Sequence, residues 1–132
     1  MLATNSLGNI TTQLGSQTMS QSFIDSGSNG LFFDMSTLTP CSAAYSGFYC
    51  PASTTSLTAT MAGISGSALV SFSVGNAQSL LNTSVTALPT LAGPMNASRT
   101  FDWGLPFFYG RSVFYGIAQT SSTWGTGPLI AF

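Results

Sequence analysis

Short runs rich in Val, Thr, Phe, Tyr and Ile alternate along this chain with clusters of Gly, Ser, Asn and Pro, and helical apolar spacing is hard to find. Runs of this kind are typical of β-strands joined by turns. The sequence therefore predicts an all-β (mainly β) fold with at most one or two short helices. The expected strands cover residues 9–14, 18–24, 31–33, 56–61, 67–74 and 129–132, and the expected helix covers 76–82.

The length of the chain, 132 residues, is enough to bury a core without a metal or several disulfides. No linker divides it and no tandem repeat is visible, so we expect a single domain over residues 1–132. Residues 62–66 separate two expected strands and predict a hairpin with a flexible tip. No uncharged apolar run approaches the roughly 18 residues that a membrane helix needs, so no membrane span is expected.

Charged side chains are scarce: the chain has three Asp, two Arg and no His, Lys or Glu, with a net charge of -1. A Ser or Cys nucleophile normally needs a His or Lys base, so catalytic triads are excluded. The residues are poor ligands for zinc, and two Arg cannot form a basic surface for nucleic acid. We expect no metal, no cofactor and no nucleic-acid partner. Acid-base catalysis would need a carboxylate, which leaves Asp25, Asp34 and Asp102.

The two cysteines, Cys41 and Cys50, lie in a loop-like stretch, and each has a Pro beside it. A disulfide there would close a short loop and would indicate an oxidising compartment. The alternative is two small buried thiols in a reducing compartment. We favour the disulfide. Residues 1–5 lack the basic start and the apolar stretch of a signal peptide, so we expect a mature piece or a fragment.

Asp25 stands at the end of an apolar run, and Ser, Gly and Ser follow it. Burial against the preceding apolar residues disfavours ionisation, whereas hydroxyl and backbone N–H donors from the turn favour the carboxylate, so protonation of Asp25 can be tuned. The alternative is an ordinary turn, in which Asp accepts backbone N–H bonds. Taken alone, the motif favours the ordinary turn.

Two segments weigh against that alternative. Residues 23–33 read Phe-Ile-Asp-Ser-Gly-Ser-Asn-Gly-Leu-Phe-Phe, and residues 103–114, about eighty positions later, read Trp-Gly-Leu-Pro-Phe-Phe-Tyr-Gly-Arg-Ser-Val-Phe. In order and spacing they resemble the two signatures of pepsin-like (retropepsin-like) aspartic proteases. The chain also resembles an uncharacterised family of exported bacterial proteins in which the first segment occurs in the later part of a longer chain.

The resemblance implies one lobe of the pepsin-like acid-protease β-barrel fold, similar to the second lobe of a two-lobed chain. In that family Asp25 would be one of two catalytic Asp, and Ser26 would grip the backbone of the opposite lobe. Gly27 would keep the turn open, and Ser28 would bond the outer carboxylate oxygen. The pair Trp103-Gly104 would cross behind the loop and brace it.

The implied function is that of an aspartic-type endopeptidase lobe in an exported, periplasmic or extracellular protein. Peptide hydrolysis would need a second lobe, from the same parent chain or from a homodimer, so the isolated monomer is expected to be inactive. Fold does not fix function, and two alternatives stay open. One is a pepsin-like module that binds protein or glycan without catalysis. The other is a secreted β-domain used in surface adhesion.

The remaining acids and aromatics are assigned to structure. Asp34 is expected to start a turn, and Asp102 is expected to pair with Arg99 or Arg111. Residues 107–109, Phe-Phe-Tyr, stand beside a strand punctuated by Pro and Gly, which favours a place in the core over a binding surface.

Overall fold

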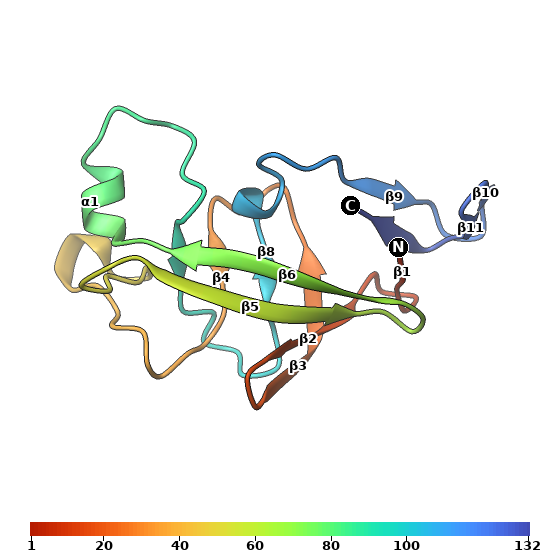
Figure 1. The fold of residues 1–132 in the computed structure, drawn as a ribbon, viewed down its shortest axis with the longest axis horizontal. Helices are drawn as coiled ribbons and strands as arrows, with labels where there is room; N and C mark the ends of the chain where they lie inside the picture. The colour runs from red at the N-terminus through yellow and green to blue at the C-terminus, as the bar shows by residue number, and fades with distance from the viewer.

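The computed structural model describes residues 1–132, and most of its regular structure is β, as the sequence predicts. Seven strands form one sheet in the order β6-β5-β2-β3-β8-β4-β7, nearly closed into a barrel (Figure 1). The one α-helix, α1, is a short element at Ala77–Leu81. The strands of this sheet are β2 (Ile10–Leu14), β3 (Gln17–Ile24), β4 (Leu31–Phe32), β5 (Thr55–Ala62), β6 (Ser67–Val74), β7 (Ala92–Gly93) and β8 (Asp102–Trp103).

The hairpin of β2 and β3 lies in the interior of the seven-stranded sheet, between β5 and β8. Ile10, Thr12 and Leu14 alternate inward on β2, and a glycine at a φ of +59°, Gly15, makes the turn into β3. The pairing shifts register between Ile10 and Thr12, which is the mark of a β-bulge. Strand β3 then runs from this turn to the loop that contains Asp25.

The hairpin of β5 and β6 pairs without interruption from Thr55↔Val74 to Ala62↔Ser67. Its inward-facing side chains include Ala59, Met61 and Val70, all buried. The tip that we expected to be flexible is hydrogen-bonded to the N-terminal strand: Ile64 N donates to Ala3 O at 2.7 Å, and Ala3 N donates to Ser65 O at 3.0 Å. The hairpin is therefore tied down at its far end.

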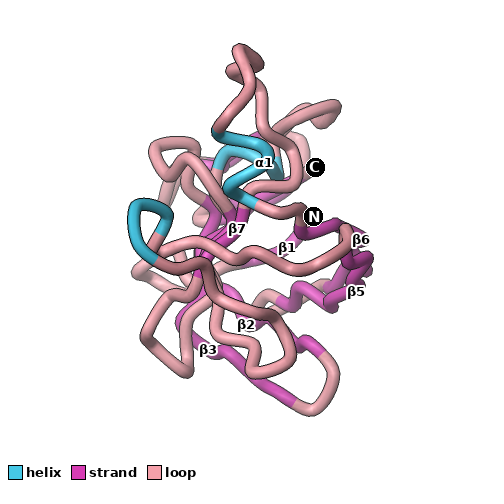
Figure 2. Tube along the Cα trace, turned by 90° about the vertical axis from the view of Figure 1, so that its left-hand side faces the viewer, coloured by secondary structure: helices cyan, strands magenta, loops and turns pink.

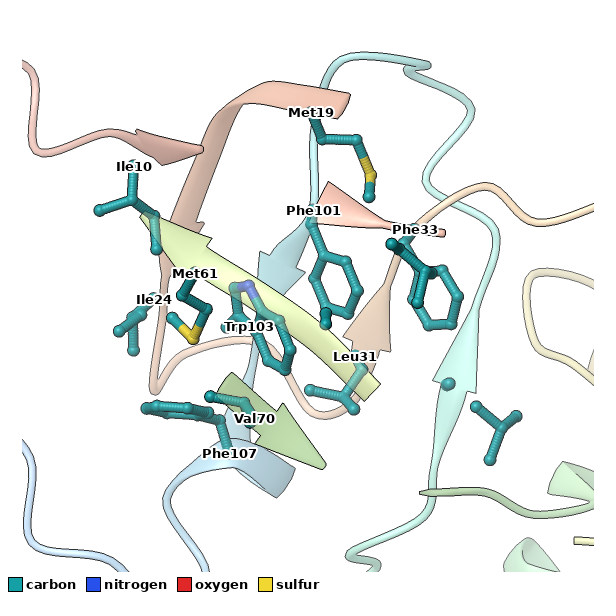
Figure 3. Close-up of a cluster of buried hydrophobic side chains, with 14 of the residues drawn as sticks. Ile10, Met19, Ile24, Leu31, Phe33, Met61, Val70, Phe101, Trp103 and Phe107 are labelled. Carbon is teal, nitrogen blue, oxygen red and sulfur yellow. The ribbon is translucent and has the colours of Figure 1, made fainter. Parts of the chain in front are cut away.

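An aromatic cluster fills the barrel (Figure 3). Phe101 stacks on Phe33 at 4.5 Å and on Trp103 at 4.1 Å between ring centroids, and Phe72 meets Phe101 and Trp103 edge-on. Phe107 packs against the Trp103 ring at 5.5 Å and is buried, as the sequence predicts. Its neighbours at 108 and 109 are only partly buried, so the expectation of a core aromatic block holds fully for one residue of the three.

A second, three-stranded sheet in the order β1-β12-β9 joins both ends of the chain. It consists of β1 (Leu2–Ala3), β12 (Leu129–Ala131) and β9 (Phe114–Gly116), and the termini lie side by side at the end of the molecule away from α1 (Figure 1). Strands β10 (Ser121–Ser122) and β11 (Gly125–Thr126) form a small hairpin beyond it. The expected closing strand at 129–132 is thus present.

Long connections cover the end of the molecule where α1 lies (Figure 2). One of them contains the disulfide between Cys41 and Cys50, with an S–S distance of 2.09 Å, so the predicted pairing is confirmed. A disulfide is consistent with an oxidising, exported environment. Among the helices, none has the length and apolar character needed to cross a membrane.

Candidate active site at the Asp25 loop

The site is built where two strands that are distant in sequence run parallel. β3 pairs with β8 through Phe23↔Asp102 and Ile24↔Trp103, and the other edge of β8 pairs with β4. The loop 25–30 leaves β3, passes the end of β8 and returns as β4. Strand β8 therefore lies between the two strands that this loop connects, and its backbone meets the loop from behind.

Asp25 is the first residue after β3, and its side chain is half-buried. Its Oδ1 accepts a hydrogen bond from Gly27 N at 2.8 Å, and its Oδ2 lies 3.1 Å from Ser28 Oγ. The backbone N–H of Asp25 donates to Trp103 O at 3.1 Å, which anchors the start of the loop to β8. The carboxylate is thus fixed in orientation by its own loop, and Asp25 remains partly exposed to solvent.

Gly104 packs directly against the inside of the loop. A Cβ added at this position would collide with Gly30 O and lie 2.8 Å from Ser28 O, so only glycine fits. The next residue closes the contact, because Leu105 N donates to Ser28 O at 2.7 Å. The structure therefore brings the segment 103–105 and the Asp25 loop together at van der Waals distance.

The other residues of the predicted motif divide between solvent and core. Ser26 and Gly27 are exposed, and a Cβ added to Gly27 would lie 3.1 Å from Asp25 Oδ1. Trp103 is fully buried, and its Nε1 donates to Thr12 Oγ1 at 2.9 Å, which satisfies both polar groups inside the barrel. The Trp103 side chain thus contributes to the core, whereas its backbone holds the loop.

Asp102 is a second carboxyl group within hydrogen-bonding distance of Ser28. Its Oδ2 is 2.5 Å from Ser28 Oγ, so one hydroxyl stands between two carboxyl groups. Asp102 is only 5% exposed, and its Oδ1 has no hydrogen-bond partner. Burial raises the pKa of Asp102; the hydrogen bond with Ser28 lowers it, and the nearby charge of Asp25 raises it further.

The expected pairing of Asp102 with an arginine is wrong. Arg99 Nη2 instead donates to Ser20 Oγ at 2.9 Å, and Arg111 Nη1 donates to Phe107 O at 2.8 Å. Side chains alternate across a strand, so Asp102 points to the face opposite its two core neighbours, toward the Asp25 loop. Asp34 lies directly before a turn closed by Leu38 N donating to Met35 O at 3.1 Å, and its own Oδ1 accepts from the distant Asn96 N at 2.8 Å.

A comparison with models of protein families identifies the family of this chain. The model described as protein of unknown function (DUF3443) matches residues 1–132. The chain belongs to the DUF3443 family. No match is found for it among the curated proteins or among the solved structures.

We did not expect from the sequence of this DUF3443 chain that two further residues lie near Asp25. One is Asp102 as a neighbour of Asp25; a signal for it was present, since an Asp between two core aromatics must face away from them. The other is Tyr115 on β9, whose hydroxyl donates to Ile24 O at 3.3 Å. Partial desolvation of Tyr115, which is 54% exposed, and to a smaller extent the charge of Asp25 raise the pKa of its hydroxyl. Nothing in the sequence signals that β9 returns to this loop.

Proposed function

We propose that this DUF3443 chain is one lobe of a pepsin-like aspartic peptidase, with Asp25 as one of the two catalytic carboxylates. The observation that carries the proposal is the bracing of the Asp25-Ser26-Gly27-Ser28 loop by the backbone of Trp103 and Gly104. This is the arrangement that the two protease-like signatures imply, although the signatures stand about eighty residues apart in the sequence. An ordinary turn needs no such support from a distant segment.

The chemistry of the loop supports the same assignment. A catalytic carboxylate must be held in one orientation and must remain accessible to water and substrate. Asp25 meets both requirements, since its oxygens face Gly27 N and Ser28 Oγ and its side chain is half-buried. In aspartic peptidases two such carboxylates share one proton: one activates the water, and the other polarises the peptide carbonyl. A single lobe supplies one of these groups.

The second carboxylate cannot come from Asp102. Asp102 is only 5% exposed and its Oδ2 contacts Ser28 Oγ, so it has too little access to the water and substrate that would reach Asp25. We therefore propose that the second Asp belongs to another lobe, from a longer parent chain or from a second copy. We also propose that the protein is exported from the cytoplasm, because disulfides form and persist in oxidising compartments and Cys41 and Cys50 form one.

The surface beside the Asp25 loop has the character that a second lobe needs. Strand β9 is an edge of its sheet, and it and the turn after it expose Phe114 by 49%, Tyr115 by 54% and Ile117 by 73%. Next to them an apolar hollow of about 230 Å³ is lined in part by Ile24 and Tyr115. Exposed apolar groups of this size around a concave site are typical of an interface.

The test is cleavage of a mixed peptide pool between pH 3 and pH 7 by the form of the protein that contains both lobes. Asp25→Asn keeps the size of the side chain and its hydrogen bond from Gly27 N, but it cannot hold or release the shared proton. We expect cleavage to stop and folding to survive, while the matched control Asp34→Asn keeps most of the activity. A statine inhibitor should block the wild type. Inhibitor-sensitive cleavage by Asp25→Asn would rule out the assignment.

A further inference from the structure

The Ser28 hydroxyl has two carboxyl groups as neighbours but only one hydrogen to give. Ser28 Oγ lies 3.1 Å from Asp25 Oδ2 and 2.5 Å from Asp102 Oδ2, and both are hydrogen-bonding distances. A serine hydroxyl donates one hydrogen bond and accepts others through its lone pairs. For both contacts to be hydrogen bonds at the same time, the three oxygens need two protons, and the second proton must then be carried by one of the two carboxyl groups.

The surroundings of the two acids decide which of them carries it. Asp25 is partly open to solvent, and its Oδ1 already accepts the Gly27 N–H, so a negative charge there is solvated and hydrogen-bonded. Asp102 is 5% exposed, and its Oδ1 has no donor at all. An ionised Asp102 would leave half of its charge buried and unpaired, whereas a neutral acid leaves only an unbonded carbonyl oxygen.

We propose that Asp102 is a second acid of this site: it holds a proton on Oδ2 and donates it to Ser28 Oγ, which leaves the Ser28 hydrogen for Asp25 Oδ2. In this arrangement Asp25 receives two donors, Gly27 N and Ser28 Oγ. When Asp102 loses its proton to solvent, the stronger acceptor is the buried carboxylate, and the Ser28 hydroxyl turns toward it. Asp25 then keeps one donor. Asp102 is thus a positioning residue that acts on Asp25 through Ser28.

No other charged group competes for Asp102. Across β8, the paired strand β4 contributes only Leu31 and Phe32, and both arginines are bonded elsewhere. On the β3 side the titratable group is Asp25, with Tyr115 near it. The charge of Asp25 opposes ionisation of Asp102, in the same direction as burial does, and both raise the pKa of Asp102. Asp102 is therefore protonated in acidic solution. As pH rises it loses this proton, and the Ser28 hydroxyl turns from Asp25 to Asp102.

The location of the proton can be tested without any activity. The chain has three Asp and no Glu, so labelling Asp with ¹³C at Cγ gives three side-chain carboxyl signals, which single Asp→Asn variants assign. We expect the Asp102 signal to titrate above about 3.9, the usual aspartate value. We also expect the Asp25 signal to show a step at the same pH, because coupled groups respond to each other. An Asp102 signal that titrates at or below that value would overturn the proposal.

Two variants separate the hydroxyl from simple charge repulsion. In Asp102→Asn the step in the Asp25 signal should vanish, because the amide stays a neutral donor to Ser28 at every pH. In Ser28→Ala the step should shrink, since only the direct effect of charge remains. A step of wild-type size in Ser28→Ala would show that the hydroxyl does not link the two acids. Asp34→Asn is the control and should leave the step unchanged.

The consequence for catalysis rests on the proposed function of Asp25. If Ser28 must point at Asp25 for peptide cleavage, activity should fall as Asp102 ionises, and Asp102→Asn should move the alkaline limb of the pH profile upward. A purely structural Asp102 would lower activity at all pH values and leave the profile in place, which would overturn its positioning role. Absence of cleavage by the wild-type form that contains both lobes, with the NMR steps as expected, would remove the protease assignment and leave the position of the proton intact.

Discussion

Replacing Gly104 with Ala is the most direct test of the contact between β8 and the Asp25 loop. The added methyl group would collide with Gly30 O and lie 2.8 Å from Ser28 O. Ordinary carbon–oxygen contacts begin at about 3.3 Å, so the loop must retreat from Ser28 alone by about 0.5 Å. The groups in the way are backbone carbonyls, and no flexible side chain can move aside instead.

The cost of this change has two sources. Forcing a methyl group into a packed site costs about 1 to 3 kcal/mol. The displacement also strains the hydrogen bonds Leu105 N–Ser28 O and Asp25 N–Trp103 O, each with a net value of about 1 kcal/mol. We therefore expect Gly104→Ala to lower the free energy of unfolding by about 3 to 5 kcal/mol, a large part of the 5 to 15 kcal/mol that is usual for a domain.

Urea denaturation followed by circular dichroism measures this loss. With an m-value of about 2 kcal/mol/M, the midpoint should fall by about 1.5 to 2.5 M. Gly110→Ala is the matched control: its φ is +74°, and nothing lies within 4 Å of an added Cβ, so it should cost only the left-handed strain of about 1 to 2 kcal/mol. If Gly104→Ala cost no more than Gly110→Ala, the proposed bracing of the loop would be refuted.

Two further predictions concern stability. Because burial raises the pKa of Asp102, the folded chain binds more protons than the unfolded chain between about pH 3.9 and that raised pKa, so stability falls as pH rises through this window, with a limiting slope of about 1.4 kcal/mol per pH unit. Urea midpoints across this range should show the fall in the wild type and its absence in Asp102→Asn; a wild type equally stable throughout would contradict the raised pKa. Replacing Cys41 and Cys50 together with Ala should lower the unfolding free energy by about 2.5 kcal/mol, as expected for a short loop closed at a separation of 9 residues. A calorimetric loss of less than about 0.5 kcal/mol would count against that estimate.

The strands that the sequence predicts well are those with a pattern of their own. Val70 and Val74 alternate with polar residues on β6, and such alternation is set by neighbours in the chain. Strand β8 has two residues, too few for any period, and it is a strand only because β3 and β4 flank it. Its place in the sheet depends on contacts about eighty residues apart, which no local pattern encodes.

The same distinction applies to the site. The Asp25 loop is identifiable because its residues are consecutive, and Gly104 because its spacing from that loop resembles the spacing between two family signatures. The link from Asp25 to Asp102 depends on the face that a two-residue strand presents, so a nearby arginine looked the more natural partner. In a chain with five charged residues, the sequence neighbours of a charge say little about its spatial neighbours.

Because Trp103 and Asp102 are neighbours on β8, the fluorescence of Trp103 can report on the charge of Asp102. Trp103 is fully buried and follows Asp102 directly, whereas the only other tryptophan, Trp124, is 48% exposed. An aqueous quencher such as iodide should therefore extinguish the emission of Trp124 and leave that of Trp103. The remaining fluorescence comes from an indole one peptide unit away from the buried acid, so a change in the charge of Asp102 can be followed by light at micromolar protein concentration.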